Sequence, residues 1–262
     1  MARGPRKHLK RIRAPKSWMM NKLGGVFTVR PSEGPHRLRE SMPITIVLRD
    51  KLRLARTNRE VDLILNQKEG LVRVDGKIRR NPKYPIGLMD VVSLPKVGAS
   101  YRVLYDVKGR FVLERLSQKE AKFKLCRIQK KAVGANSVTY LVTHDGRTLR
   151  FADKDIKIHD SVRYNVETGE VGERYTMAVG NLAYVHNGTN RGRVGIINHI
   201  THFPGNYDLV NLKDEKGNMF TTRINYVFVL GNGNKSSISL PRDKGVKLNI
   251  LEETEKREAE RQ

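Results

Sequence analysis

The chain has 262 residues and a pI near 10.3, and its 51 lysine and arginine residues against 27 acidic ones give a formal net charge of +24. A charge of this size favours binding to a polyanion, and nucleic acid is the commonest large polyanion in a cell. Association with a membrane would need a basic amphipathic helix, a lipidation signal or a long apolar run, and none is clear in the sequence. We therefore predict no membrane association and a cytosolic or nuclear protein.

Candidate catalytic and metal-binding residues are few. The single cysteine, Cys126, excludes an intramolecular disulfide and a thiolate zinc cluster, and we interpret it as a buried apolar group rather than a reactive thiol. His199 and His202 are one helical turn apart, but no acid or cysteine completes a metal set. Because nucleophile-elbow and P-loop motifs are also absent, we predict no enzyme, no cofactor and no small-molecule substrate.

Residues 1–41 are predicted to form a basic extension, because the first 22 residues contain no acid and four prolines interrupt any long helix. We expect this arm to order on an acidic partner. Trp18 is interpreted in two ways: it stacks on a base or anchors the arm in a groove, or it plugs the chain's own first domain. The candidate RNA-binding residues of the arm are Arg6, Lys7, Lys10, Arg11, Lys16 and Trp18.

Residues 42–104 are predicted to form a small α/β domain with two helices. Apolar residues from Ile44 to Ala55 recur at helical spacing, and a second helix begins with Thr57 as its cap and Glu60 three residues later. The helix stops by Gly70, a hairpin turns at Asp75-Gly76, and a strand covers residues 86–94.

The helix pair carries the first candidate binding surface. Arg49, Arg53 and Arg56 follow at spacings of four and three, which predicts one cationic face beside the exposed amides at the start of the second helix. Such a face suits backbone phosphates, although a solvated helix surface is the alternative. The residues assigned to this surface are Arg49, Arg53, Arg56, Asn58, Arg59, Lys77, Arg79 and Arg80.

The remainder of the chain is predicted to be β-rich. Residues 105–172 contain short strands, a short helix near 117–123 and a hairpin at Asp145-Gly146, which together suggest a small central barrel. Residues 173–232 contain five short strands separated by glycine, asparagine and proline, which suggests a second small barrel. Residues 233–262 form a C-terminal extension with a solvated helix from about residue 252.

The glycine–arginine turn (residues 188–195) is the second candidate surface. Its glycines permit close backbone approach, and its arginines can contact an RNA groove, whereas an ordinary glycine-rich hairpin is the alternative. The residues assigned to it are Gly188, Asn190, Arg191, Gly192 and Arg193.

Two segments resemble known RNA-binding modules. Residues 42–94 resemble the small α/β module shared by ribosomal proteins, pseudouridine synthases and tyrosyl-tRNA synthetases. Residues 178–211 resemble a KOW motif, with Gly188, Gly192 and Gly195 at its turn positions. In this order, over nearly the whole chain, they resemble the S4e family of small-subunit ribosomal proteins, in its eukaryotic branch. The strings that carry this likeness are residues 2–11, 84–91, 141–148 and 238–242.

The resemblance implies an α+β, mostly β fold with an S4-like RNA-binding domain, a central β barrel and a KOW (SH3-like) barrel behind the basic extension. It also implies a structural constituent of the small ribosomal subunit that binds rRNA, contacts neighbouring ribosomal proteins and supports assembly and translation. The expected location is the cytoplasm, with assembly in the nucleolus. The alternatives are a non-ribosomal RNA-binding factor with a KOW domain and an accessory module of an RNA-modifying enzyme. Because cations far outnumber aromatic residues, contacts to phosphates should dominate.

Overall fold

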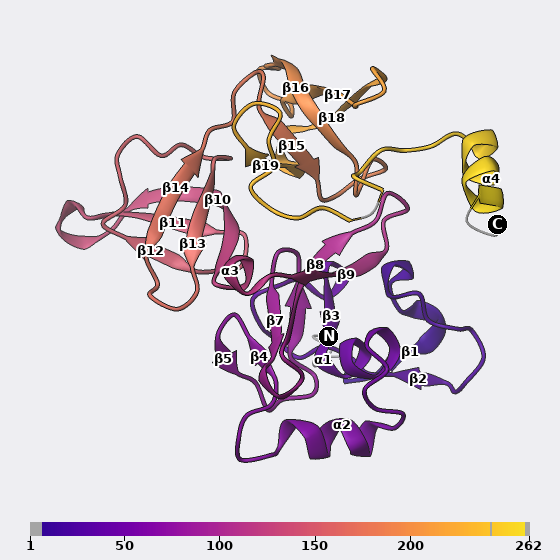
Figure 1. Cartoon of the computed structure of the whole chain (residues 1–262). Helices are drawn as coiled ribbons and strands as arrows, with labels where there is room; N and C mark the ends of the chain where they lie inside the picture. Colours follow the sequence, from indigo (N-terminus) through magenta and orange to yellow (C-terminus); the bar gives the residue numbers. More distant parts are fainter. Residues whose placement is uncertain (1–6, 242, 260–262) are drawn as a thin grey trace, which may run out of the picture.

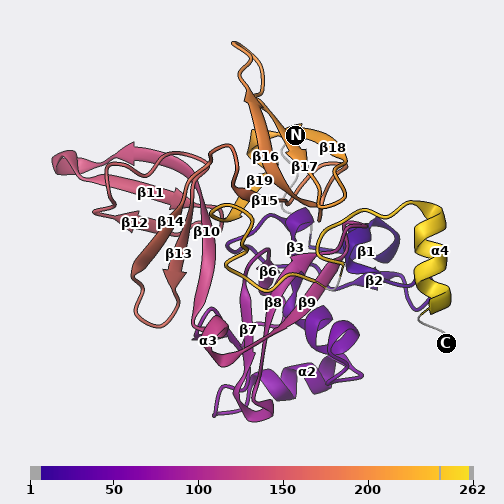
Figure 2. The ribbon, with the colours of Figure 1, turned by 45° about the horizontal axis from the view of Figure 1, so that its top comes forward.

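The computed structural model describes residues 7–241 and 243–259, which form a mostly β protein with a few short helices. Within these residues the strands lie in three five-stranded and two two-stranded sheets. Figures 1 and 2 show three β-rich lobes around a common centre, with the C-terminal helix projecting to one side. The prediction of a mostly β fold with few helices is confirmed. None of the helices in the described ranges is long and apolar enough to cross a membrane.

The first lobe (residues 41–116) contains a sheet with strand order β5-β4-β7-β8-β9 and the separate pair β3–β6. The predicted hairpin at Asp75-Gly76 is confirmed, since Val74 pairs with Lys77 across it. Strands β8 and β9 form a second hairpin, so the boundary expected at residues 104 and 105 falls inside a paired unit. The strands are β3 Ser41–Pro43, β4 Arg73–Val74, β5 Lys77–Ile78, β6 Pro85–Gly87, β7 Val91–Leu94, β8 Ala99–Tyr105 and β9 Phe111–Leu116.

The first lobe also corrects the predicted helix pair. Helix α1 (Ile44–Ile46) continues as a wider helical turn over Val47–Lys51 and ends there, so the prediction of a helix reaching Ala55 is wrong. The backbone of Arg53 has φ +55°, which no right-handed helix can contain. Helix α2 (Asn58–Leu65) begins as predicted, with the Thr57 hydroxyl accepting a 3.3 Å hydrogen bond from the Glu60 N–H.

The strand predicted over residues 86–94 is two strands, β6 and β7. The turn between them places Met89 at φ +67°. The Asp90 carboxylate accepts a 2.9 Å hydrogen bond from the Gly87 N–H, which closes this turn. A side-chain bond of this kind competes with the strand ladder, and this explains the interruption.

The second lobe (residues 123–175) has strand order β12-β11-β10-β13-β14. The hairpin predicted at Asp145-Gly146 is confirmed by the pairing of Leu141 with Leu149. The predicted short helix is also present: α3 (Gln118–Ala121) is capped by Ser117. The strands are β10 Phe123–Val133, β11 Thr139–Thr143, β12 Thr148–Arg150, β13 Ser161–Asn165 and β14 Val171–Tyr175.

The third lobe (residues 182–231) has strand order β18-β17-β16-β15-β19, so its first strand pairs with its last. All five strands predicted here are confirmed, and β16 runs further than expected, to Thr201. The strands are β15 Leu182–Val185, β16 Val194–Thr201, β17 Leu209–Lys213, β18 Met219–Arg223 and β19 Val227–Gly231. After this lobe the tail leads to α4 (Ile250–Ala259), the C-terminal helix predicted near residue 252.

The arm lies against the first lobe. Its strands β1 (Leu9–Lys10) and β2 (Phe27–Thr28) pair with each other. Trp18 is 1% exposed, and its Nε1–H donates a 2.8 Å hydrogen bond to the carbonyl of Ser41. The interpretation of Trp18 as a plug against the first domain is therefore confirmed. The arm thus has an apolar anchor within the chain, and its ordering on an acidic partner stays a prediction.

One hydrophobic core runs through the first and third lobes, and a small second core lies within the second lobe. The Tyr184 hydroxyl joins the third lobe to the first. It accepts a hydrogen bond from the Tyr105 N–H (2.7 Å) and donates one to the Tyr105 carbonyl (3.0 Å). Burial raises the pKa of Tyr184 well above its usual range. Cys126 is fully buried in the second core, as predicted.

A buried ion cluster joins the first lobe to the second. The Lys124 ammonium, fully buried on β10, contacts the carboxylates of Asp75, Asp90 and Asp145 at 2.8, 2.6 and 2.8 Å. Arg147 adds a second cation, at 2.7 Å from both Asp75 and Asp145. Burial alone would raise the pKa of Asp90 and Asp145, but His36 and Lys124 beside Asp90, and Lys124 beside Asp145, hold the pKa of both carboxyls well below the usual range.

His144 lies beside this cluster, at the meeting point of all three lobes. Its Nδ1 accepts a 3.2 Å hydrogen bond from the Arg127 N–H, and its Nε2 lies 3.2 Å from the Leu88 carbonyl. Its ring meets Phe228 of the third lobe edge-on, with 5.3 Å between centroids. Because Nδ1 accepts and Nε2 donates, the neutral imidazole fits, and burial lowers the pKa of His144 to about 4.

Removing the charge of Lys124 should destabilise the protein. The change Lys124→Met leaves Asp75 and Asp145 with Arg147 alone and Asp90 with His36 alone, and the loss of one partner from such a cluster costs roughly 3–5 kcal/mol. Urea denaturation followed by circular dichroism measures the free energy of unfolding. The control is Lys122→Met, at an exposed lysine 3.4 Å from Glu167, which should change the free energy by less than about 1 kcal/mol. Equal losses in both variants would contradict this role for the cluster.

Stability should also fall with pH below about 6.5, the usual pKa of a histidine in an unfolded chain. Burial lowers the pKa of His144 to about 4 and that of His186 to about 3. Unfolding therefore takes up protons as the pH falls from 6.5 to 4, and each group contributes up to about 1.4 kcal/mol per pH unit. Denaturation at several pH values measures this slope. It should flatten in a His144→Gln/His186→Gln variant and persist in His8→Gln.

Candidate nucleic-acid interface

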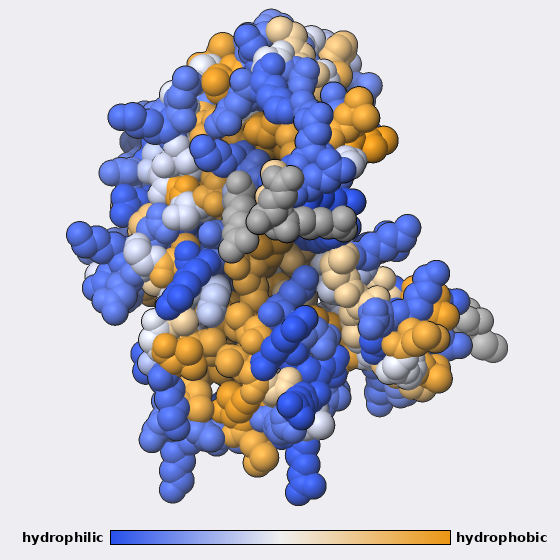
Figure 3. Space-filling view, turned by 45° about the vertical axis from the view of Figure 1, so that its right-hand side comes forward, coloured by the Kyte–Doolittle hydropathy of each residue, from blue (hydrophilic) through white to orange (hydrophobic). Residues whose placement is uncertain are grey.

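The arm and the first lobe enclose a cationic groove of about 550 Å³, here called the arm groove. Its charged lining consists of five lysine or arginine side chains and no carboxylate. Figure 3 shows hydrophilic side chains projecting over much of one face of the molecule. The groove residues are Lys7, His8, Leu9, Arg11, Gly24, Phe27, Thr28, Val29, Arg30, Arg49, Asn58 and Lys83. Four predicted residues, Lys7, Arg11, Arg49 and Asn58, are thus brought together.

Two of the groove arginines are held by hydrogen bonds within the chain. Arg11 donates to the carbonyls of Asn21 and Gly24 and so fixes the loop that leads to β2. Arg49 donates a 2.7 Å hydrogen bond to the Asn58 side chain and two more to the carboxylate of Asp50. The hydrogen bonds to Asp50 raise the pKa of Arg49 above its ordinary value. Arg49 is therefore a positioned cation whose charge is partly compensated.

Three other groove cations, Lys7, Arg30 and Lys83, make no ion pair with the described part of the chain. Beside them, Phe27 is 56% exposed and lies with its ring centroid 5.4 Å from that of His8. Free cations next to an exposed aromatic ring match the chemistry of an RNA strand, with phosphates on the cations and a base on the ring. Phe27, Arg30 and Lys83 were not predicted; the run of β-branched and aromatic residues at 26–29 is the sequence signal for a strand there.

The predicted face of Arg49, Arg53 and Arg56 is corrected. Because the first helix ends at Lys51, Arg53 and Arg56 lie in the connection to α2 and do not continue the face of Arg49. Arg53, Arg56 and Arg59 are all exposed, so they can reach an anion from the connection and from the first turn of α2. The amides there are partly used, because the Glu60 carboxylate accepts a 2.7 Å hydrogen bond from the Arg56 N–H.

The residues predicted after the Asp75-Gly76 turn divide into two kinds. Lys77 and Arg80 are exposed, and Lys77 lies on β5, the edge strand of its sheet. Arg79 is half-buried, with its guanidinium carbon 4.4 Å from the centroid of the Tyr84 ring. Arg79 thus packs on the protein, whereas Lys77 and Arg80 face solvent.

The glycine–arginine turn is more internal than predicted. Gly192 is buried at φ +87°, and an added Cβ would lie 2.0 Å from the carbonyl oxygen of Asp106, so the close approach that this glycine permits is to the β8–β9 loop. Arg193 forms an ion pair with Asp214 and covers the Phe220 ring at 3.7 Å. The expectation that Gly192 and Arg193 press against RNA is therefore wrong, because both are already packed. Gly188, Asn190 and Arg191 remain at least partly exposed.

The remaining arm predictions have mixed outcomes. Arg6 lies outside the described residues. Lys10 is exposed on β1, and Lys16 lines a second cleft, which is described below. The prediction that Trp18 stacks on a base is wrong, because its ring is buried in the core.

Two histidine-containing clusters of the described residues contain atoms of the kind that bind metal ions. His199 and His202 lie on β16 and just after it, and His202 pairs with Asp208 at 2.6 Å. Ligand atoms of Cys126, His144 and Asp145 lie within 4.8 Å of one another. Burial raises the pKa of the Cys126 thiol far above its usual range, and both His144 nitrogens already have partners. This donor set therefore does not fit a metal ion.

The fold and the groove define a basic, multi-lobed protein built to bind a polyanion, and comparison with known proteins gives its family. Family models match at residues 3–39 (RS4NT domain), 97–171 (ribosomal family S4e) and 214–261 (40S ribosomal protein S4 C-terminus). The chain is 52% identical to small ribosomal subunit protein eS4 of Tetrahymena thermophila over 256 residues, covering 98% of this chain and 99% of that one. It is 51% identical to the eS4 of Ixodes scapularis over 257 residues, with 98% and 97% covered.

The comparison with a solved structure indicates the same family. The 30S ribosomal protein S4e of Thermoplasma acidophilum superposes with a TM-score of 0.64 at 33% identity, covering 76% of this chain and 99% of that one. The chain therefore belongs to the ribosomal protein family S4e, as the resemblance implied.

Loss of the free groove cations should weaken RNA binding. In a Lys7→Gln/Arg30→Gln/Lys83→Gln variant, the slope of log K against log salt should decrease by about 2 to 3 for single-stranded or duplex RNA, because each lost phosphate contact removes about 0.7–0.9. Filter binding between 50 and 200 mM salt would measure it. The control changes three exposed lysines of the second lobe, Lys130, Lys154 and Lys157, to glutamine. Equal slopes in the two triple variants would contradict the groove assignment.

Proposed function

We propose that this protein is a structural constituent of the small ribosomal subunit, where it binds rRNA and supports subunit assembly and translation. Its similarity to eS4 proteins over nearly the full chain carries this proposal. The arm groove supplies the chemistry, because unpaired cations beside an exposed ring suit a phosphate backbone with an accessible base. The role is structural and not enzymatic, in keeping with the family.

We assign the binding residues by exposure. The arm supplies Lys7, Lys10, Arg11 and Lys16, the first lobe supplies Arg49, Arg53, Arg56, Asn58, Arg59, Lys77 and Arg80, and the glycine–arginine turn supplies Gly188, Asn190 and Arg191. Phe27, Arg30 and Lys83 join this set. Since these positions are spread over three parts of the molecule, they suit a folded RNA surface better than a single strand in one channel.

We also propose a division into domains: extension 1–41, S4-like domain 42–116, central barrel 117–176, KOW (SH3-like) barrel 177–232 and tail 233–262. The second boundary is moved from 104 to 116 because β8 and β9 are paired, and the third from 172 to 176 because β14 runs to Tyr175. The KOW assignment is supported by five strands in which β15 pairs with both β16 and β19. The partners would be small-subunit rRNA and neighbouring ribosomal proteins, with no membrane and no small-molecule substrate, in the cytoplasm after assembly in the nucleolus.

Sedimentation tests the proposed function. Tagged protein should co-migrate with small subunits through a sucrose gradient and remain there after a 0.5 M salt wash, because many contacts are made together. A free RNA-binding factor would wash off under the same condition. In isolation, the purified protein should lose at least about a thousandfold in rRNA affinity between 50 and 200 mM salt if six or more phosphates are contacted. Affinity and sequence preference that survive high salt would contradict recognition through phosphates.

A further inference from the structure

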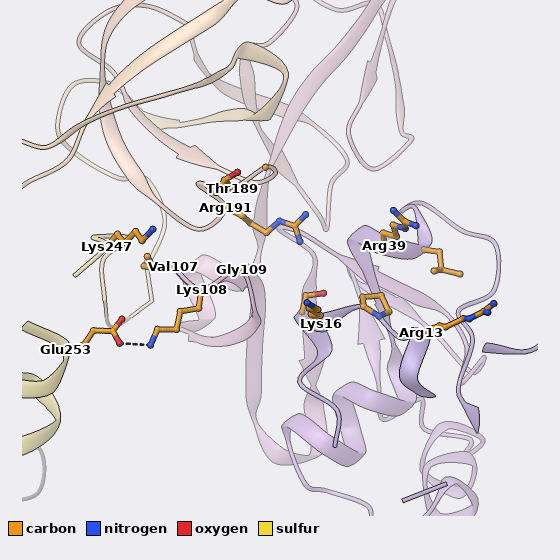
Figure 4. Close-up of a pocket in the computed structure, with 14 residues that line it drawn as sticks. Arg13, Lys16, Arg39, Val107, Lys108, Gly109, Thr189, Arg191, Lys247 and Glu253 are labelled. Atoms are coloured by element: carbon orange, nitrogen blue, oxygen red, sulfur yellow. Dashed lines mark hydrogen bonds and ion pairs between the residues drawn. The ribbon is translucent and has the colours of Figure 1, made fainter. Parts of the chain in front are cut away.

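A second cationic cleft, here called the junction cleft, lies where five segments of the chain meet (Figure 4). It has a volume of about 810 Å³ and is lined by six lysine or arginine side chains and one carboxylate. The segments are residues 13–17 of the arm, the turn at Leu38–Glu40 near the end of the arm, the β8–β9 loop, the glycine–arginine turn and the tail. The charged residues are Arg13, Lys16, Arg39, Lys108, Arg191, Lys247 and Glu253.

The centre of the cleft is held rigid by Arg191. Its guanidinium carbon lies 4.8 Å from the centroid of the Tyr105 ring, and its Nη2 donates a 2.9 Å hydrogen bond to Asn187. The neighbouring Gly192 packs against the carbonyl of Asp106, so the turn and the β8–β9 loop are fixed to each other. Figure 4 shows Arg191 extending from its turn into the space between Lys108 and the arm. The cleft therefore presents a prepositioned cation.

An anion already occupies one position in this cleft. The Glu253 carboxylate of α4 lies 2.8 Å from the Lys108 ammonium, and the two side chains are 32% and 41% exposed. A second ion pair joins Glu252 of α4 to Lys216 at 2.6 Å. No residue of α4 in the described range is buried. The helix is thus seated by surface ion pairs, each of which changes an equilibrium by less than about fivefold.

We propose that the junction cleft is a binding site for the phosphodiester backbone of RNA, in which Glu253 occupies a phosphate position until RNA displaces α4. This proposal rests on the proposed function and assigns a site and an order of events to it. Six cations exceed what one carboxylate can neutralise, so the cleft keeps a strong attraction for further negative charge. Binding of RNA in the cleft is more favourable in free energy than binding of the Glu253 carboxylate, because each bound phosphate also releases condensed counterions.

The first test compares two glutamates of α4 that differ in their contacts. Glu253→Gln removes the charge beside Lys108, whereas Glu258→Gln removes an exposed charge from the same helix. Both substitutions raise the net charge of the protein by one, so they change its long-range electrostatic attraction for RNA equally. Binding to purified small-subunit rRNA at 50 mM salt should become about two- to fivefold tighter in the first variant and less than 1.5-fold tighter in the second. Equal effects would overturn the proposal.

The second test follows the ion pair itself with a carbodiimide, which activates a carboxylate so that a nearby lysine forms an amide and a urea leaves. Mass spectrometry of the free protein should find the Lys108–Glu253 cross-link, and saturating rRNA should abolish it. The Lys122–Glu167 pair, 3.4 Å apart in the second lobe, is the control within the same molecule and should still be cross-linked. A Lys108–Glu253 cross-link that persists with bound rRNA would overturn the displacement of α4.

A third variant tests the cleft as a site. Arg39→Gln/Lys108→Gln should weaken rRNA binding and lower the slope of log K against log salt by about 1.4 to 1.8, because two phosphate contacts are lost. If the wild-type protein binds rRNA and the slope in this variant is unchanged, the junction cleft is not an RNA-binding site, but the proposed function stands. Wild-type protein that fails to bind rRNA at all overturns both.

Discussion

The buried ion cluster around Lys124 is the contact on which the arrangement of the lobes depends. Apolar surfaces can shift relative to each other with only a small loss of stabilising free energy. Lys124, in contrast, pairs with all three carboxylates only in one relative position of the first and second lobes. His144 extends this constraint to the third lobe through Phe228. The junction cleft depends instead on the contact between the first and third lobes, where the Tyr184 hydroxyl bonds to the Tyr105 backbone and Gly192 packs against the Asp106 carbonyl.

The high net charge of the chain divides into cations that build the fold and cations that face outward. Arg102 donates to the carbonyls of Glu120 and Phe123, and Arg127 donates to those of Asn225 and Val227. Burial lowers the pKa of both arginines to about 10, yet they connect elements distant in sequence. The total of lysine and arginine residues therefore overstates the charge available to a polyanion. What remains available includes the cations that line the arm groove and the junction cleft.

Local patterns in the sequence predicted most strands, both main hairpins and the cap at Thr57, because these depend on residues close together in the chain. Features decided by distant contacts were missed or wrong. Arg53 has a positive φ, which the spacing of apolar residues does not indicate. At position 192 a glycine is needed because the Asp106 carbonyl, far away in sequence, leaves no room for a Cβ atom. The burial of Trp18 was left open between two interpretations for the same reason. Of the candidate site, composition predicted the chemistry, but only the fold brought Lys7 and Arg49 into one groove.

A lysine that pairs with carboxylates occurs at a buried and at an exposed position, and the two ion pairs differ in how easily they exchange partners. At Lys124 the ammonium is fully buried, so an incoming phosphate could replace a carboxylate only by opening the core. At Lys108 the ammonium is 41% exposed, and water already competes with Glu253 for it. Desolvation therefore decides which ion pairs are permanent and which can be exchanged. This chain separates the two kinds, with the permanent pairs between its first two lobes and the exchangeable pairs under α4.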